Sequence, residues 1–105
     1  MKIHLVYITT KDKAEARRIG RHLVETKLVA CVNIIDHVNS MYFWNGEFQD
    51  NQEAVIIAKT NQERLSDLID TVKARHSYEC PCVVTIPLSD GNPDFLKWVE
   101  NQIAF

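Results

Sequence analysis

Two long extended segments around one tight turn constrain the fold of this chain more than any other feature. One segment covers residues 30–44, the other covers residues 47–59, and the dipeptide Asn45-Gly46 between them suits a two-residue hairpin turn. Each arm has about 14 residues, on the order of 45 Å at roughly 3.3 Å per residue, whereas strands usually have about 5 or 6 residues. The sequence therefore predicts a β-hairpin with unusually long arms.

The rest of the chain supplies partners for this hairpin. Residues 2–8 and residues 82–87 are apolar, β-rich segments that predict two more strands. Three helices are predicted from residue pairs that are typical of a helix N-terminus. The first helix starts with Asp12 and Glu15, and the third starts with Asn92 and Pro93. The second starts with Thr60 and Glu63 and covers residues 61–75. The order β-α-β-β-α-β plus a C-terminal helix predicts an α+β, ferredoxin-like fold, with a single domain over residues 1–105.

The far half of the hairpin is predicted to overhang the helices. Helices of about 15 residues reach only about 22 Å, so they cannot cover arms of this length. The overhanging residues are largely aromatic, namely Met41, Tyr42, Phe43, Trp44 and Phe48. Exposed aromatic surface and a long free strand edge are normally covered, which favours pairing with other copies of the chain. The alternative is a hairpin that bends over its own sheet at Asp36-His37 or Asn39-Ser40.

Composition excludes several partners and suggests a compartment. The formal net charge is -2, without the basic excess on which nucleic-acid binding draws, so no nucleic acid is expected. The chain has neither a signal-peptide pattern nor an apolar run long enough for a membrane span, so no membrane partner is expected. Its three cysteines suit a reducing compartment, and the expected location is the cytoplasm.

The segment HSYECPCVV, residues 76–84, is the main candidate site. The metal interpretation takes His76, Glu79 and Cys80 as ligands for a weakly bound copper or zinc ion. The structural interpretation makes the same residues a rigid loop at a subunit junction, with His76 and Glu79 in hydrogen bonds and Cys82 packed inward. The sequence does not decide between the metal interpretation and the structural interpretation. No phosphate-binding loop or hydrolase motif is present, and no organic cofactor is expected.

Three other residues are candidates for a ligand site or a junction. Cys31 is expected to be a buried, inert thiol, because no cationic neighbour in the sequence lowers its pKa. Lys59 ends an apolar strand, where it could meet Glu79 or an anionic ligand, or simply extend its ammonium group into water. Trp44 is expected to be a packing anchor.

The whole chain resembles the CutA divalent-cation tolerance family. The resemblance lies in the order and spacing of short matches, and these are Ala30-Cys31-Val32-Asn33, Ser40, Tyr42, Trp44, Gly46, Glu53, Lys59-Thr60, His76, Tyr78-Glu79, Pro81, Pro87, Gly91-Asn92, Leu96 and Trp98. The resemblance implies a ferredoxin-like subunit that assembles as a homotrimer through its long hairpins, and a role in tolerance of copper and other divalent cations. It also places Tyr78 at the junction.

The chain departs from the family pattern at three places. Asp36-His37 stands where the family usually has Pro-Gly, and the positions of a cysteine and a second histidine found in some members hold Ile8 and Arg75. A copper site built on those two residues therefore cannot be carried over.

Three functions are compatible with these features. The leading hypothesis is a non-enzymatic trimer that binds divalent metal ions. A second is a trimeric sensor of a small ligand or a signalling protein, which rests on fold analogy. The third is an enzyme with Cys31 as nucleophile and His76 as base, supported only by the presence of both residue types.

Overall fold

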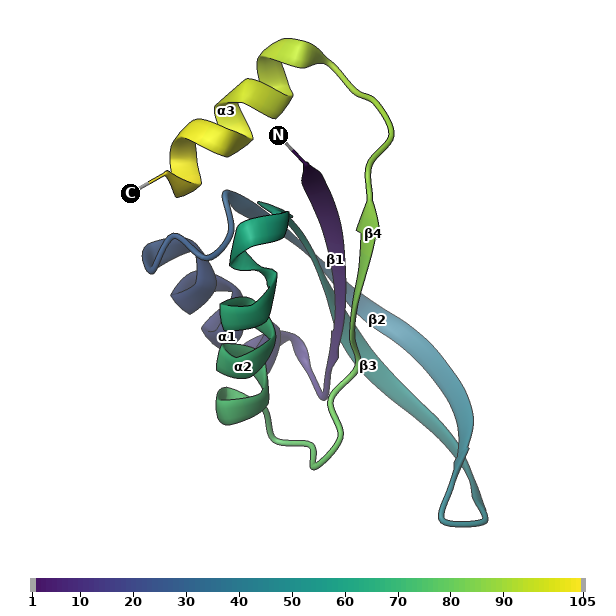
Figure 1. The fold of residues 1–105 in the computed structure, drawn as a ribbon. Helices are drawn as coiled ribbons and strands as arrows, with labels where there is room; N and C mark the ends of the chain where they lie inside the picture. The colour runs from purple at the N-terminus through teal and green to yellow at the C-terminus, as the bar shows by residue number, and fades with distance from the viewer. Residues whose placement is uncertain (1, 105) are drawn as a thin grey trace.

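The computed structural model of the protein describes residues 2–104. Its elements follow the predicted order (Figure 1), and they are β1 (Ile3–Thr10), α1 (Lys13–Glu25), β2 (Cys31–Trp44), β3 (Glu47–Asn61), a short 3₁₀ turn (Gln62–Arg64), α2 (Leu65–Arg75), β4 (Val83–Pro87) and α3 (Pro93–Ile103). The α+β class and the ferredoxin-like order are confirmed.

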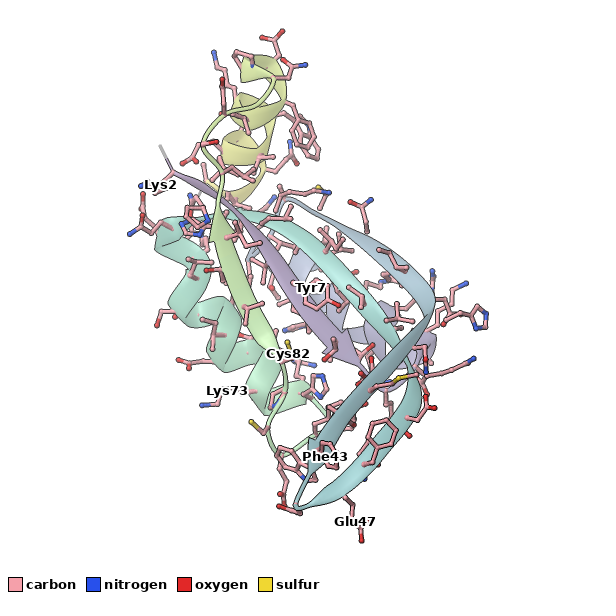
Figure 2. The ribbon with its side chains drawn as sticks, turned by 90° about the vertical axis from the view of Figure 1, so that its right-hand side faces the viewer. Lys2, Tyr7, Phe43, Glu47, Lys73 and Cys82 are labelled. Carbon is pink, nitrogen blue, oxygen red and sulfur yellow. The ribbon has the colours of Figure 1, made fainter. Side chains whose placement is uncertain are left out.

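One antiparallel sheet carries all four strands in the order β2-β3-β1-β4. Side chains alternate between its two faces, and α1 and α2 cover one of them, here called the helix face (Figure 1). On that face Ala54, Ile56 and Ala58 of β3 are each 0% exposed. The opposite face, called the open face, is seen in Figure 2, where Tyr7 lies on it.

Helix α1 is fixed by its first turn and by a close approach to the sheet. The side chain of Asp12 caps it, because Asp12 Oδ1 accepts a hydrogen bond of 2.8 Å from the Glu15 backbone N–H. Gly20 faces β2 so closely that a Cβ there would lie 3.3 Å from a methyl group of Val32. A second, smaller core lies at the end of the sheet, where Val99 and Ile103 of α3 cover Ile3 and Ala30.

The hairpin extends beyond the rest of the sheet, as predicted. β1 pairs only with Ala54 to Asn61, so the part of β3 from Glu47 to Glu53 has β2 as its only partner among the described strands. Asn45 (φ 50°) and Gly46 (φ 81°) form the turn, with the positive φ angles that a type I′ hairpin turn requires. The overhanging segment, residues 38–53, is called the tip.

A β-bulge marks the root of the tip. Ile35 pairs with Val55 and Val38 pairs with Glu53, so β2 has one more residue than β3 in this interval. The bulge contains Asp36 and His37, and His37 adopts φ 58°. The bend does not fold the tip over its own sheet (Figure 1), and Phe43 and Phe48 are 72% and 59% exposed.

Two local predictions were wrong. The second helix was predicted to start from Thr60 with Glu63, but β3 continues to Asn61, and Asn61 Oδ1 caps the turn by accepting from the Arg64 N–H at 3.1 Å. The Thr60 hydroxyl is buried and donates to the Leu28 carbonyl at 2.7 Å, a contact 32 residues away in sequence.

Cys82 was predicted to pack inward, yet it is exposed and lies directly before β4 on the open face (Figure 2). The run Cys82-Val83-Val84 is apolar on both faces of the strand, so composition could not decide which residues face the core. In the structure Val83 packs on the helix-face core, whereas Val84 is 52% exposed.

Candidate functional site

A cavity of about 540 Å³ lies on the open face, between the tip and the loop of residues 76–82 that joins α2 to β4. The tip contributes Tyr42, Trp44 and Glu53. They project on one side of the hairpin, because Glu53 pairs with Val38 and side chains two residues apart along a strand share a side, as Val38, Tyr42 and Trp44 do. The loop contributes its exposed residues, and these are Glu79, Cys80 and Cys82, together with the half-buried Tyr78. The site thus joins segments that are about 30 residues apart in the chain.

Glu53 and Tyr78 link the two walls of the cavity. The Tyr78 hydroxyl donates a hydrogen bond of 2.7 Å to Glu53 Oε2, and Glu53 is only 6% exposed. Burial raises the pKa of Tyr78 well above its usual range, and the hydrogen bond to Glu53 and the charge of that carboxyl group raise it further. Tyr78 therefore remains a hydrogen-bond donor to Glu53 throughout the physiological pH range.

His76 lies behind the cavity wall and holds the loop in place. Its ring nitrogens make two hydrogen bonds: Nδ1 accepts from the Tyr78 backbone N–H at 3.0 Å, and Nε2 is 2.7 Å from the Thr9 carbonyl oxygen. A carbonyl can only accept, so these partners assign the proton to Nε2. The His76 side chain is 0% exposed, and its ring lies 4.8 Å from that of Tyr78.

Glu15 is a buried carboxylate that supports the same loop from α1. Its Oε1 accepts from the Lys11 N–H at 3.0 Å and its Oε2 accepts from the Ser77 N–H at 2.9 Å. Burial acts to raise the pKa of Glu15, but the hydrogen bonds from Lys11 and Ser77 and the nearby His76 outweigh it and leave the pKa below its ordinary value. The ionised form of Glu15 therefore stabilises the folded loop.

The structure brings only part of the predicted site together. Trp44, Tyr78, Glu79 and Cys80 line the cavity, and His76 lies directly behind it. Trp44 is 48% exposed in the single chain rather than enclosed.

Lys59 and Cys31 lie elsewhere on the sheet. They pair with each other at the root of the hairpin, six residues from Glu53 along β3, or roughly 20 Å. Lys59 Nζ contacts Asn33 Oδ1 and does not meet Glu79, and Cys31 is half-buried rather than fully buried. Cys31 is also remote from His76: the His76 ring bonds to Thr9, which pairs with Val55, and Val55 lies four residues, or roughly 13 Å, from Lys59 along β3, so these two residues do not form a catalytic pair.

The metal interpretation needs donors that converge. Within residues 2–104 no group of three or more His, Cys, Asp or Glu side chains is placed to hold one metal ion. Glu79, Cys80 and Cys82 nevertheless share the rim of one cavity, and both thiols are free and exposed.

Two residues of this region were missed as site residues from sequence. Glu15 was recognised only as part of a helix cap, and Glu53 only as a position shared with a family. The available signal for Glu53 was a single carboxylate at the start of an otherwise apolar stretch, Glu53 to Lys59. For Glu15 there was none, because its partner Ser77 lies 62 residues away.

The architecture defines a class of small α+β proteins: a ferredoxin-like domain with an overhanging hairpin and an acidic, aromatic cavity between this overhang and the loop of residues 76–82. The family model described as CutA1 divalent ion tolerance protein matches residues 4–102, and the chain belongs to this family. It is 39% identical over 100 residues to a divalent-cation tolerance protein CutA of Archaeoglobus fulgidus, covering 95% of this chain and 97% of that protein.

Solved structures agree with this assignment. CutA1 from Ehrlichia chaffeensis superimposes with a TM-score of 0.94 at 37% identity, covering 100% of this chain and 99% of the other. CutA1 from Oryza sativa gives a TM-score of 0.96 at 35% identity, covering 99% and 95%. The chain spans only 55% of the length of the curated chloroplastic relative from rice, to which it is 37% identical over 93% of its own length.

Relatives in this family have different locations. The rice relative is named as chloroplastic, and one archaeal structure is titled as periplasmic. In the present chain, no helix within residues 2–104 has the length and apolar character needed to cross a bilayer.

Proposed function

We propose that the protein is a non-enzymatic homotrimer that acts in divalent-cation tolerance in the cytoplasm by binding metal ions, copper or zinc, at its subunit junctions. Family membership supports the general role, since close relatives are named divalent-cation tolerance proteins. The observation that supports a binding site at a subunit junction is the position of the cavity, which is bounded on one side by the uncovered tip.

Assembly is supported by the amount of apolar surface that a single chain leaves in water. The open face carries the exposed apolar residues Tyr7, Ile35, Val84 and Ile86, and the tip adds Met41, Phe43 and Phe48 on the other side of the hairpin. Soluble monomers seldom expose apolar patches of this kind, and a free strand edge adds unpaired backbone groups. Packing of three hairpins around one another would cover both.

Metal binding is supported by the chemistry of the cavity rim. The carboxylate of Glu79 and the thiols of Cys80 and Cys82 are donors suited to zinc or copper. A single chain does not complete a coordination sphere from the residues described, so the remaining donors would come from a second copy at the junction. The His76 ring is engaged by Thr9 and Tyr78, and its proposed contribution to the metal is indirect, through the position of the loop.

Sedimentation equilibrium tests the assembly. At micromolar concentration the protein should sediment at about three times the chain mass of 12.1 kDa. A clean monomer over the same range would contradict the trimer and, with it, the completion of a metal site by a second copy.

Calorimetry with Zn²⁺ and with Cu⁺ under reducing conditions tests the metal. A double variant Cys80→Ser/Cys82→Ser should lose affinity, while His76→Ala should lower thermal stability more than it lowers affinity. Cys31→Ser is the matched control, because this thiol lies at the hairpin root, away from the cavity. Unchanged affinity in the double variant would remove the loop from the metal hypothesis.

A second candidate is a trimeric sensor of a small ligand. The specific observation in its favour is the cavity itself, since about 540 Å³ lies within the usual range for small-molecule sites. A bare metal ion would occupy only a small part of it.

A further inference from the structure

We propose that the cavity between the tip and the loop of residues 76–82 binds a small organic cation, an alkylammonium group held between the Glu53 carboxylate and the rings of Tyr42, Trp44 and Tyr78. This inference rests on the ligand-sensing alternative given above, for which it names the ligand class, and it is independent of metal binding.

The charge of the lining selects a cation. Two carboxylates, Glu53 and Glu79, line the cavity, and none of its lining residues is a lysine, arginine or histidine. Glu53 is the deeper of the two, since it is 6% exposed whereas Glu79 is exposed. An anionic ligand would meet two negative groups there without a compensating cation.

The hydrogen bonding of Glu53 leaves half of its carboxylate available. Oε2 accepts from the Tyr78 hydroxyl, and no donor among residues 2–104 reaches Oε1. Oε1 is not among the side-chain atoms that are fully buried without a partner, so this oxygen stays accessible to a ligand. An ammonium group in the cavity would supply both the missing contact and the opposite charge.

The rings supply the second half of the recognition. Tyr42, Trp44 and Tyr78 reach the cavity from its two walls, and the face of an aromatic ring attracts a cation within about 6 Å of its centre. Such an aromatic surface suits an alkylated ammonium, which is weakly hydrated and has an apolar exterior, better than a strongly hydrated metal ion. Size points the same way, since a bare ion cannot contact a carboxylate and three rings in a cavity of about 540 Å³.

The walls are held in place before any ligand arrives. Tyr78 is fixed by its hydroxyl contact to Glu53, by its backbone N–H to His76 Nδ1 and by the ring of His76 behind it. The Tyr42 hydroxyl accepts a hydrogen bond of 3.3 Å from Asn51 Nδ2. Preorganised rings lose little conformational entropy on binding.

Calorimetry with choline as the probe tests the inference. The buffer contains EDTA, so that no metal contributes, and the comparison ligand is 3,3-dimethylbutan-1-ol, which replaces the quaternary ammonium by an uncharged group of the same shape. Choline should bind at least tenfold more tightly than the neutral alcohol, and Glu53→Gln should remove at least tenfold of the choline affinity. Glu47→Gln is the matched control, because this carboxylate lies on the tip outside the cavity and should leave affinity unchanged.

A second pair of variants keeps the test decisive if Glu53→Gln does not fold. Tyr42 is 38% exposed, so Tyr42→Leu should fold and weaken choline binding, whereas Tyr42→Phe retains the ring and most of the affinity. Absence of choline binding, equal affinity for the neutral alcohol, or equal affinity in the Leu and Phe variants would overturn the inference. Sedimentation and metal titration of the same preparations are read separately, so failure of the ammonium site leaves the trimer and the metal hypothesis to their own tests.

Discussion

The two halves of β3 have similar backbone pairing and very different surroundings. The base half, Ala54 to Asn61, lies between β1 and β2, and its alternate side chains are buried under α1 and α2. The tip half, Glu47 to Glu53, pairs with β2 alone and exposes its one aromatic side chain, Phe48. Hydrogen bonding along the ladder is enough to define a strand, but the stability of each half depends on what covers its side chains. In the base the chain covers itself, and in the tip we expect a second copy to do so.

The largest expected effect is the loss of stability caused by a substitution in the base half of β3. Ile56 is 0% exposed on the helix face, and Ile56→Ala should lower the free energy of unfolding by about 4 kcal/mol, because it removes buried methyl groups and leaves a cavity. Urea denaturation followed by far-UV circular dichroism measures this loss. Val24→Ala on the exposed side of α1 is the control, at 38% exposure, and should cost well under half as much. Equal losses in the two variants would mean that the base is not the stable half.

The second prediction tests whether the tip carries the assembly of copies. Trp44→Ala should leave the fold of the chain intact and weaken association by an amount on the order of 3 kcal/mol, provided that the ring becomes buried between copies. Sedimentation velocity over a dilution series, without added ligand, gives the change in the dissociation constant. The exposed-helix variant Val24→Ala should dissociate like the wild type. An unchanged dissociation constant for Trp44→Ala would show that the tip does not carry the assembly.

The smallest effect concerns the contact between α1, which covers the base, and the loop of residues 76–82. Glu15→Gln should lower the free energy of unfolding by about 2 kcal/mol at neutral pH, because an amide replaces a buried carboxylate that accepts two backbone N–H groups. The folded-state pKa of Glu15 lies below its ordinary value of 4.5, so the unfolded chain binds the proton first as the pH falls. The contribution is therefore complete above about 4.5 and is lost as the pH falls through the lowered folded-state pKa.

Urea unfolding of wild type and Glu15→Gln at several pH values tests this. The difference between the two proteins should be largest at neutral pH and shrink below pH 4.5. A difference that stays constant down to the acid transition would assign the effect to packing rather than to the charge of Glu15.

Local signals in the sequence were sufficient for the strands and for the hairpin. The Asn45-Gly46 turn, the long extended arms and the caps at Asp12 and Asn92 all act within a few residues, and the structure contains each of them. The start of the second helix could not be predicted in the same way. The Thr60 hydroxyl donates a hydrogen bond to the distant Leu28 carbonyl and does not cap the nearby helix N-terminus. Nothing in the local sequence distinguishes these two possible partners.

The candidate site was predicted in part for the same reason. The loop residues Glu79 and Cys80 stood out because their side chains are potential metal ligands, and Tyr78 was named through the family resemblance; all three line one cavity with Trp44. Lys59 and Cys31 were grouped with them although strand register places both at the other end of the sheet. Register depends on long-range pairing, so residue type alone could not separate the two groups.

The bulge at Asp36-His37 joins two registers of the same β2–β3 ladder. Beyond Val38 the pairing on β2 is advanced by one position, and Tyr42 and Trp44 project on the same side as Glu53. Deletion of His37 would restore a regular ladder in which Val38 still pairs with Glu53, so Tyr42 and Trp44 would stay on the same side as Glu53. The side chains that the tip offers to the cavity are therefore set by the Asn45-Gly46 turn, which pairs Trp44 with Glu47, and not by the number of residues in the bend. A change of chain length at this position would alter the bend of the hairpin and leave the same side chains on the cavity side.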